Sequence, residues 1–140
     1  MSFVWTPDLS VGVESIDMQH QELFLRVNSL LLAVGGRRQE PEILGTLAFL
    51  GDYVVSHFED EERLMRKSSY PRLPAHAAEH CQLTKTFGRL RTKFARHGID
   101  ALLATDVEGE LCAWLVHHVQ GTDRELGKWL SERVGDAVGQ

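Results

Sequence analysis

The sequence predicts an all-α protein, an antiparallel up-down-up-down four-helix bundle with an ordered N-terminal arm. Four observations lead to this fold class. Four long segments carry apolar residues in alternating steps of three and four, which keeps one stripe of each helix facing a bundle core. Breakers containing glycine or proline separate these segments, and no segment alternates with period two for long enough to form a convincing strand. Short connections between long helices favour antiparallel neighbours.

The expected helix boundaries follow from these breakers. Residues 1–14 form the arm, and the helices are expected at 15–34, 41–67, 74–97 and 105–133 of a single domain that spans 1–140. The first helix stops at Gly35, and the second stops before Pro71. The third has Pro74 in its first turn and Gly98 just past its end, where these two residues are favoured.

Composition and charge exclude several classes of function. A net charge of −5 and a pI near 5.8, without a basic stripe, argue against nucleic acid or an anionic membrane as the main partner. No apolar run approaches the length of about 18 residues that a membrane span needs, and the N-terminus lacks a targeting pattern, so we expect a cytoplasmic protein. Cys81 and Cys112 show no C-x-x-C spacing, which indicates reduced thiols.

Histidine is unusually frequent, with seven residues, and several lie on the apolar seams of the helices. His20 takes one position of the first seam, which reads Ile16, His20, Leu23, Val27, Leu30, Val34. His57 and Glu61 take successive positions of the second, which reads Ile43, Leu47, Leu50, Val54, His57, Glu61, Leu64. The third seam reads His76, His80, Leu83, Phe87, Leu90, Phe94. His76 and His80 lie on the third seam with the i, i+4 spacing that lets two imidazoles leave one helix face. In antiparallel order these positions meet at one end of the bundle. Burying an unpartnered polar group costs about 1–3 kcal/mol, so this set requires something that joins its members.

A purely structural explanation accounts for some of these residues taken singly. A lone histidine such as His20 is usually a core residue with a hydrogen bond, and a His–Glu pair one turn apart is common on a surface. The stretch HFEDEERLM offers four carboxylates, of which only Glu61 lies on the apolar seam. We expect Glu59, Asp60 and Glu62 to belong to a solvated face. Three helices each carry histidine at an inward-facing seam position, however, and this coincidence favours a shared site over separate core histidines.

The fourth helix carries the stretch WLVHHVQGTD at residues 114–123. Its seam reads Val107, Leu111, Trp114, His118. His118 therefore points inward, whereas His117 is rotated by about 100° and is expected to be exposed or flanking. In a regular helix Asp123 would lie about 140° from His118. We predict a π-bulge around residues 119–122, next to Gly121, that turns Asp123 inward; such bulges often occur at functional sites.

The assembled polar set consists of five histidines and two carboxylates: His20, His57, Glu61, His76, His80, His118 and Asp123. It has too many ligands for one structural zinc, which normally takes four. Two metals that share bridging carboxylates would use all seven, and imidazole with carboxylate suits iron, manganese or zinc. The residues therefore predict a dinuclear transition-metal site.

These motifs resemble those of the hemerythrin family, specifically its single-domain bacterial members, over nearly the whole chain. The resemblance is carried by WTPDLSVGVESIDMQH, HFEDEERLM, YPRLPAHAAEH and WLVHHVQGTD. Together their spacings are highly specific, and all seven ligand positions of the family pattern are filled. His97 and His117 fall outside the pattern, and His97 is more simply a residue at a helix C-terminus.

The resemblance implies a non-heme di-iron centre that binds dioxygen reversibly, for oxygen transport, storage, delivery or sensing. By this resemblance His76, His80 and His118 hold one iron, and His20 and His57 hold the other. Glu61 and Asp123 bridge the two irons with a solvent-derived oxo or hydroxo group. Three histidines and three bridges fill an octahedron, whereas two histidines and three bridges leave a vacant position for dioxygen.

Several apolar residues beside these ligands are candidate walls of an oxygen pocket, although each is equally well explained as plain core: Leu23, Phe24, Phe58, Trp114 and Leu115. Reversible binding needs such a dry pocket. A di-iron enzyme, such as an oxidase, peroxidase or nitric-oxide-handling protein, is the alternative function. It is less favoured because carboxylate-rich Glu-x-x-His ligand sets are typical of oxygen-activating bundles, and histidine predominates here. A metal-binding or signalling module without oxygen chemistry is a third possibility.

Overall fold

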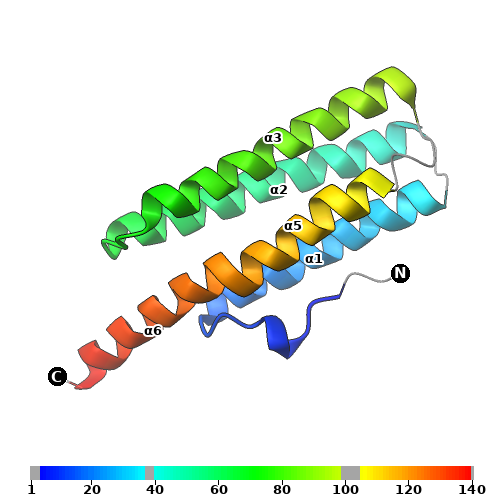
Figure 1. The fold of residues 1–140 in the computed structure, drawn as a ribbon. Helices are drawn as coiled ribbons and strands as arrows, with labels where there is room; N and C mark the ends of the chain where they lie inside the picture. The colour runs from blue at the N-terminus through cyan, green and yellow to red at the C-terminus, as the bar shows by residue number, and fades with distance from the viewer. Residues whose placement is uncertain (1–3, 37–39, 99–104, 140) are drawn as a thin grey trace.

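The computed structural model describes residues 4–36, 40–98 and 105–139, and within these ranges the chain forms long helices and no strand (Figure 1). Helix α1 spans Glu14–Gly35, α2 spans Glu40–Lys67 and α3 spans Leu73–His97. Residues 1–3 of the predicted arm lie outside the described residues. Among the described residues, no helix combines the length and the apolar character that crossing a bilayer requires.

The fourth helix runs from residue 105 to Gly139 and contains two π-helical turns. The first turn, η2, spans Val107–Cys112 and is followed by α5 at Ala113–His118; the second, η3, spans Val119–Asp123 and leads into α6 at Arg124–Gly139. The bulge predicted around residues 119–122 is therefore confirmed, whereas the sequence did not predict η2. The helix also continues beyond residue 133, where the sequence predicted its end.

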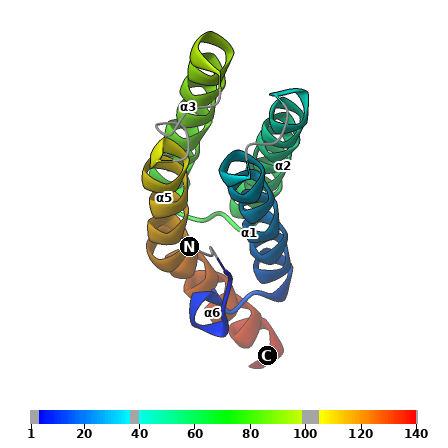
Figure 2. The same ribbon diagram turned by 90° about the vertical axis from the view of Figure 1, so that its right-hand side faces the viewer.

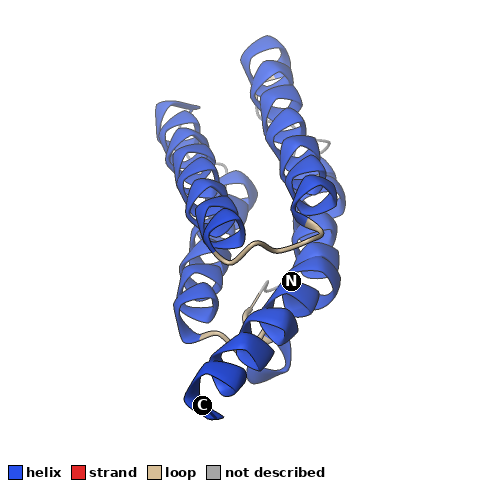
Figure 3. Cartoon of the chain, turned by 90° about the vertical axis from the view of Figure 1, so that its left-hand side faces the viewer, coloured by secondary structure: helices blue, strands red, loops and turns tan. Residues whose placement is uncertain are grey.

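The helices pack as the predicted antiparallel bundle. Helix α1 contacts α2, α2 contacts α3, and the fourth helix contacts α3 and α1 through η2. Figure 1 shows α2 and α3 on one side of the bundle and α1 with α5 on the other. Figure 2 shows the same helices from one end of the bundle. Within the described residues, a short turn at residues 68–72 joins α2 to α3, and it crosses the bundle in Figure 3.

Local sequence explains the ends of α1 and α3. Helix α1 ends at Gly35, and the backbone N–H of Gly36 donates to the Leu32 carbonyl at 2.8 Å. Pro74 lies in the first turn of α3, where its missing N–H is not needed. Helix α3 ends before Gly98, whose φ of 69° is a left-handed conformation that glycine adopts without strain. His97 is exposed in the last turn of α3, as expected for a residue outside the metal-ligand pattern.

The N-terminal arm is ordered over its described residues and packs on the bundle. It contains a short 3-10 helix, η1, at Pro7–Leu9, and it buries Leu9 and Val11. The carboxylate of Asp17 accepts a hydrogen bond from the Val11 backbone N–H at 2.8 Å. The Arg124 guanidinium of α6 donates to the carbonyl of Asp8. The arm is thus tied both to the start of α1 and to α6.

Two hydrophobic clusters fill the core. The bundle cluster includes Leu23, Val54, Phe58, Leu83, Phe87 and Leu115; the arm cluster includes Leu9, Val11, Ile16, Phe24, Met65, Tyr70 and Leu126. Along each helix the buried polar residues lie between a member of the arm cluster and a member of the bundle cluster, for example between Ile16 and Leu23 on α1. The polar residues therefore form one layer with apolar packing on both sides.

Two positions of the predicted seams differ from the observed core. Leu64 is only half-buried and Met65 is fully buried, because the step after Glu61 is four residues rather than three. Trp114 is half-buried, whereas Leu115 is 1% exposed. The π-helical turn η2 places an additional residue in the preceding turn, which rotates the seam of α5 from Trp114 to Leu115.

Gly127 is a position where the fourth helix approaches the backbone of the arm closely. A Cβ atom at this position would overlap the backbone carbonyl of Val11. We predict that Gly127→Ala displaces the arm and lowers the free energy of unfolding by about 1–3 kcal/mol, as overpacking does elsewhere. Gly88→Ala is the control, because a Cβ there meets nothing within 4 Å and should leave stability equal or slightly higher. Urea unfolding measures both, and equal midpoints would contradict the close approach.

Candidate metal centre

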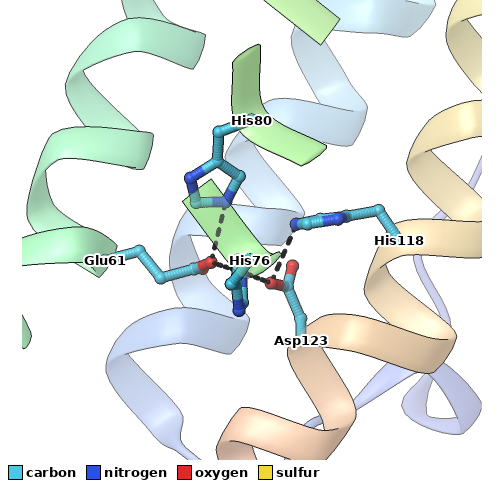
Figure 4. A group of neighbouring side chains, drawn as sticks. All are labelled: Glu61, His76, His80, His118 and Asp123. Carbon is cyan, nitrogen blue, oxygen red and sulfur yellow. Dashed lines mark hydrogen bonds and ion pairs between the residues drawn. The ribbon is translucent and has the colours of Figure 1, made fainter. Parts of the chain in front are cut away.

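The buried polar layer brings together side chains from all four helices. Figure 4 shows the larger group, Glu61, His76, His80, His118 and Asp123, whose candidate ligand atoms lie within 4.8 Å of one another. A second group, His20, His57, Glu61 and Asp123, meets the same limit. All of these residues are buried. The two groups divide the histidines into three and two, and they share both carboxylates.

Glu61 faces both groups with different oxygen atoms. Its Oε1 lies 2.5 Å from Nε2 of His76 and 3.1 Å from Nε2 of His80. Its Oε2 lies 3.3 Å from Nε2 of His57, one turn earlier on α2. A carboxylate placed in this way presents one oxygen to each half of the site, as a ligand that bridges two metals must.

Asp123 has the same arrangement on the opposite side. Its Oδ1 lies 2.9 Å from Nε2 of His76 and 3.1 Å from Nε2 of His118, and its Oδ2 lies 2.9 Å from Nε2 of His20. The side chain reaches this position because η3 inserts an additional residue between His118 and Asp123. His118 is buried and His117 is exposed, as the helical phase predicted.

Several ligand-face atoms have no hydrogen-bond partner in the part of the chain that the structure describes. They are Nε2 of His20, His76 and His118, Oε2 of Glu61 and Oδ1 of Asp123. These atoms are buried and lie 2.5–3.3 Å from other atoms of the polar layer, but the contacts lack hydrogen-bond geometry. Buried polar atoms are rarely left in this state in a folded protein. Imidazole nitrogens and carboxylate oxygens that converge without hydrogen bonds fit a transition-metal centre.

The two buried carboxylates of the polar layer also require positive charge beside them. Burial acts to raise the pKa of Asp123, but His118 and the neighbouring imidazoles hold it well below its ordinary value. The pKa of Glu61 is likewise lowered against burial. Burial acts to lower the pKa of His76, yet its contacts with the two carboxylates raise it to about 9. The pKa of His57 is lowered, chiefly by burial. The two carboxylates thus stay ionised, balanced by imidazolium protons or by metal ions that replace them.

Three of the imidazoles have polar partners behind them. The Nδ1–H of His57 donates to the amide oxygen of Gln19 at 2.6 Å, and that of His80 donates to Glu62 at 2.8 Å. The Nδ1–H of His118 donates to Glu79 at 2.7 Å. Such partners fix the orientation of a ligand imidazole and increase its basicity.

These partners were missed from the sequence. Glu62 was expected on a solvated face, but it is half-buried against His80 because the i+1 position beside Glu61 turns towards α3. Glu59 is exposed as expected, whereas Asp60 is half-buried and accepts a hydrogen bond from Gln19 at 3.2 Å. The available signal was an acidic or amide residue directly beside a candidate ligand, as in Gln19-His20 and Glu79-His80.

Aromatic and aliphatic residues close the space beside the ligands. Phe58 stacks on His80 with ring centroids 3.8 Å apart, and Trp114 stacks on His118 at 4.5 Å. Leu23 and Leu115 are buried in the bundle cluster with Phe58, and Trp114 packs against that cluster. Phe24, which the sequence grouped with these residues, is buried in the arm cluster instead.

Comparison with known proteins identifies the family to which this site belongs. Residues 11–130 match the hemerythrin HHE cation binding domain. The chain belongs to the hemerythrin family. All seven candidate ligands lie inside the matched hemerythrin domain.

Hemerythrins from bacteria are similar to the chain over most of its length. The bacteriohemerythrin of Methylococcus capsulatus is 37% identical over 130 residues, which cover 91% of this chain and 95% of that protein. The bacteriohemerythrin of Stenotrophomonas maltophilia is 31% identical over 121 residues, covering 86% and 76%. The crystal structure of a wild-type hemerythrin matches with a TM-score of 0.77 and 32% identity over 89% of this chain and 95% of that one.

The adjacent histidines of the fourth helix provide a direct test of the site. We predict that His118→Ala, loaded with ferrous iron without oxygen, retains at most one metal ion or loses the centre, because a buried ligand and its contact with Asp123 are removed. His117→Ala is the matched control and should retain the full metal content, since His117 is exposed. Metal analysis after gel filtration measures both, and equal metal content would contradict the assignment of His118.

Proposed function

We propose that the protein binds dioxygen reversibly at a non-heme di-iron centre, whose two irons would carry an oxo or hydroxo bridge. The observation that carries this proposal is the division of five buried histidines into groups of three and two that share Glu61 and Asp123. Its membership of the hemerythrin family supports the same conclusion.

The residues proposed to hold the metals follow from the two groups of ligand atoms. His76, His80 and His118 are assigned to one iron, His20 and His57 to the other, and Glu61 and Asp123 to both. When bound, the iron pair supplies the two electrons that dioxygen takes up and recovers them on release. The chain provides one donor fewer on the side of His20 and His57, so this is the side where a small molecule has room to bind.

We infer that the apolar residues around the centre keep water away from the bound molecule. Leu23, Phe58 and Leu115 are buried, and Trp114 covers His118 with its ring. We assign these residues, with Phe24 on the side of the arm cluster, to the walls of the oxygen pocket. A dry pocket matters because water or an external reductant would intercept bound dioxygen and leave the centre oxidised.

Dioxygen is the partner that this proposal requires, and we place the protein in the cytoplasm as a single domain. Its acidic net charge disfavours nucleic acid or anionic lipid as the main partner. The candidate ligand set has five histidines and two carboxylates, whereas carboxylate-rich Glu-x-x-His sets are typical of oxygen-activating bundles. This difference supports a role in oxygen transport, storage, delivery or sensing rather than in catalysis.

An oxygenation cycle tests the proposed function. The protein is loaded anaerobically with ferrous iron, exposed to air, and returned to an oxygen-free atmosphere while the optical spectrum is followed. We expect a visible absorption band that appears in air and disappears under argon over repeated cycles. Prompt and irreversible conversion to the diferric form would contradict a carrier and favour a di-iron oxidase or peroxidase.

The pocket wall gives a second prediction. Leu115→Ala should increase the rate of irreversible oxidation in air, because a cavity beside Trp114 and His118 admits water. Leu111→Ala is the control, since Leu111 is equally buried in the bundle cluster one turn away. Both variants should lose about 2–5 kcal/mol of stability. A similar oxidation rate in the two variants would show that the effect is general destabilisation and not access to the pocket.

A further inference from the structure

We propose that Glu79 is a positioning residue that holds the π-helical turn η3 in place and so aims both His118 and Asp123 at the metal centre. This role rests on the proposed metal site and concerns a residue outside its ligand set. Glu79 lies on α3, one residue before His80, and faces the fourth helix.

The contacts of Glu79 reach both ends of the turn. Its Oε1 accepts a hydrogen bond from Nδ1 of His118 at 2.7 Å, directly before η3. The hydroxyl of Thr122, inside η3, lies 2.7 Å from Oε1 and 2.8 Å from Oε2 of the same carboxylate. One side chain of α3 therefore joins the residue that precedes the π turn to a residue near its end.

The turn needs such a contact because its own sequence does not favour it. Isolated π turns are rare in helices, and Gly121 weakens the helix at this point. A regular α-helix through the same residues would place Asp123 about 140° from His118. The two ligands could then no longer share one site, although the backbone would lose no hydrogen bonds.

The charge of Glu79 suits this role. Its carboxylate accepts hydrogen bonds from Nδ1 of His118 at 2.7 Å and from the Thr122 hydroxyl, which lies 2.7 Å and 2.8 Å from its two oxygens. Charge-assisted hydrogen bonds of this kind are roughly twice as strong as neutral ones.

Glu62 offers a comparison within the same molecule. It accepts a hydrogen bond from Nδ1 of His80 at 2.8 Å and is similarly half-buried, but its contact is with α3 and not with η3. Both carboxylates support a ligand imidazole. Only Glu79 also binds the hydroxyl of the π turn.

Hydrogen–deuterium exchange on the full chain saturated with Zn²⁺ tests the proposal. Zinc is used so that the result does not depend on dioxygen chemistry, and saturation keeps occupancy equal among variants. We expect Glu79→Ala and Thr122→Val to exchange their amides over residues 119–123 about tenfold faster than the unmodified protein, the effect of losing about one hydrogen bond to a charged group. Glu62→Ala and Thr122→Ser keep the hydrogen bonds of Glu79 with His118 and with the hydroxyl at position 122. Both variants should exchange the amides of this segment at the rate of the unmodified protein.

Two results would overturn the role of Glu79. One is unchanged exchange over 119–123 in both Glu79→Ala and Thr122→Val. The other is equally faster exchange in Glu62→Ala, which would show that any carboxylate behind an imidazole has this effect. If the exchange results are as expected and the oxygenation cycle fails, Glu79 positions η3 but the proposed oxygen binding is wrong. If the oxygenation cycle succeeds and the exchange results differ, only the proposed role of Glu79 is wrong.

Discussion

The structure depends on burying seven polar side chains in one layer of an otherwise apolar core. Each of them alone would destabilise the fold, and their convergence makes burial tolerable only when positive charge joins the two carboxylates. The apolar clusters lie on either side of the layer, whose seven side chains are 0–3% exposed. Glu61 and Asp123 are the centre of this arrangement, because each faces both groups of histidines with separate oxygens.

The periodicity of single helices accounts for most of the fold and for the whole candidate ligand set. The seams of α1 and α3 are buried at every predicted position, including His20 and His80. In a regular helix Asp123 would lie about 140° from His118, and this mismatch also predicted the π turn η3. Such features can be predicted from the sequence because they depend on the residues of one helix.

Other features depend on how neighbouring helices are rotated against each other, which one sequence does not state. The contacts of Gln19, Glu62 and Glu79 with ligand imidazoles each cross from one helix to another. The apolar residues around η2 fit a regular helix, so the sequence gives no sign of this π turn. For that reason the sequence did not predict that Leu115 is buried in place of Trp114. The two sides of the site also differ in these partners: carboxylates support His80 and His118, whereas a neutral amide supports His57.

The additional residue in η3 has an effect beyond the metal ligands. Everything after it on the fourth helix is turned by about 100° relative to a regular helix. The face that receives the arm, with Gly127 against Val11 and Ser131 donating to the carbonyl of Gly12, lies after this residue. One additional residue thus sets the register of both the candidate metal centre and the helix face that contacts Val11 and Gly12 of the arm.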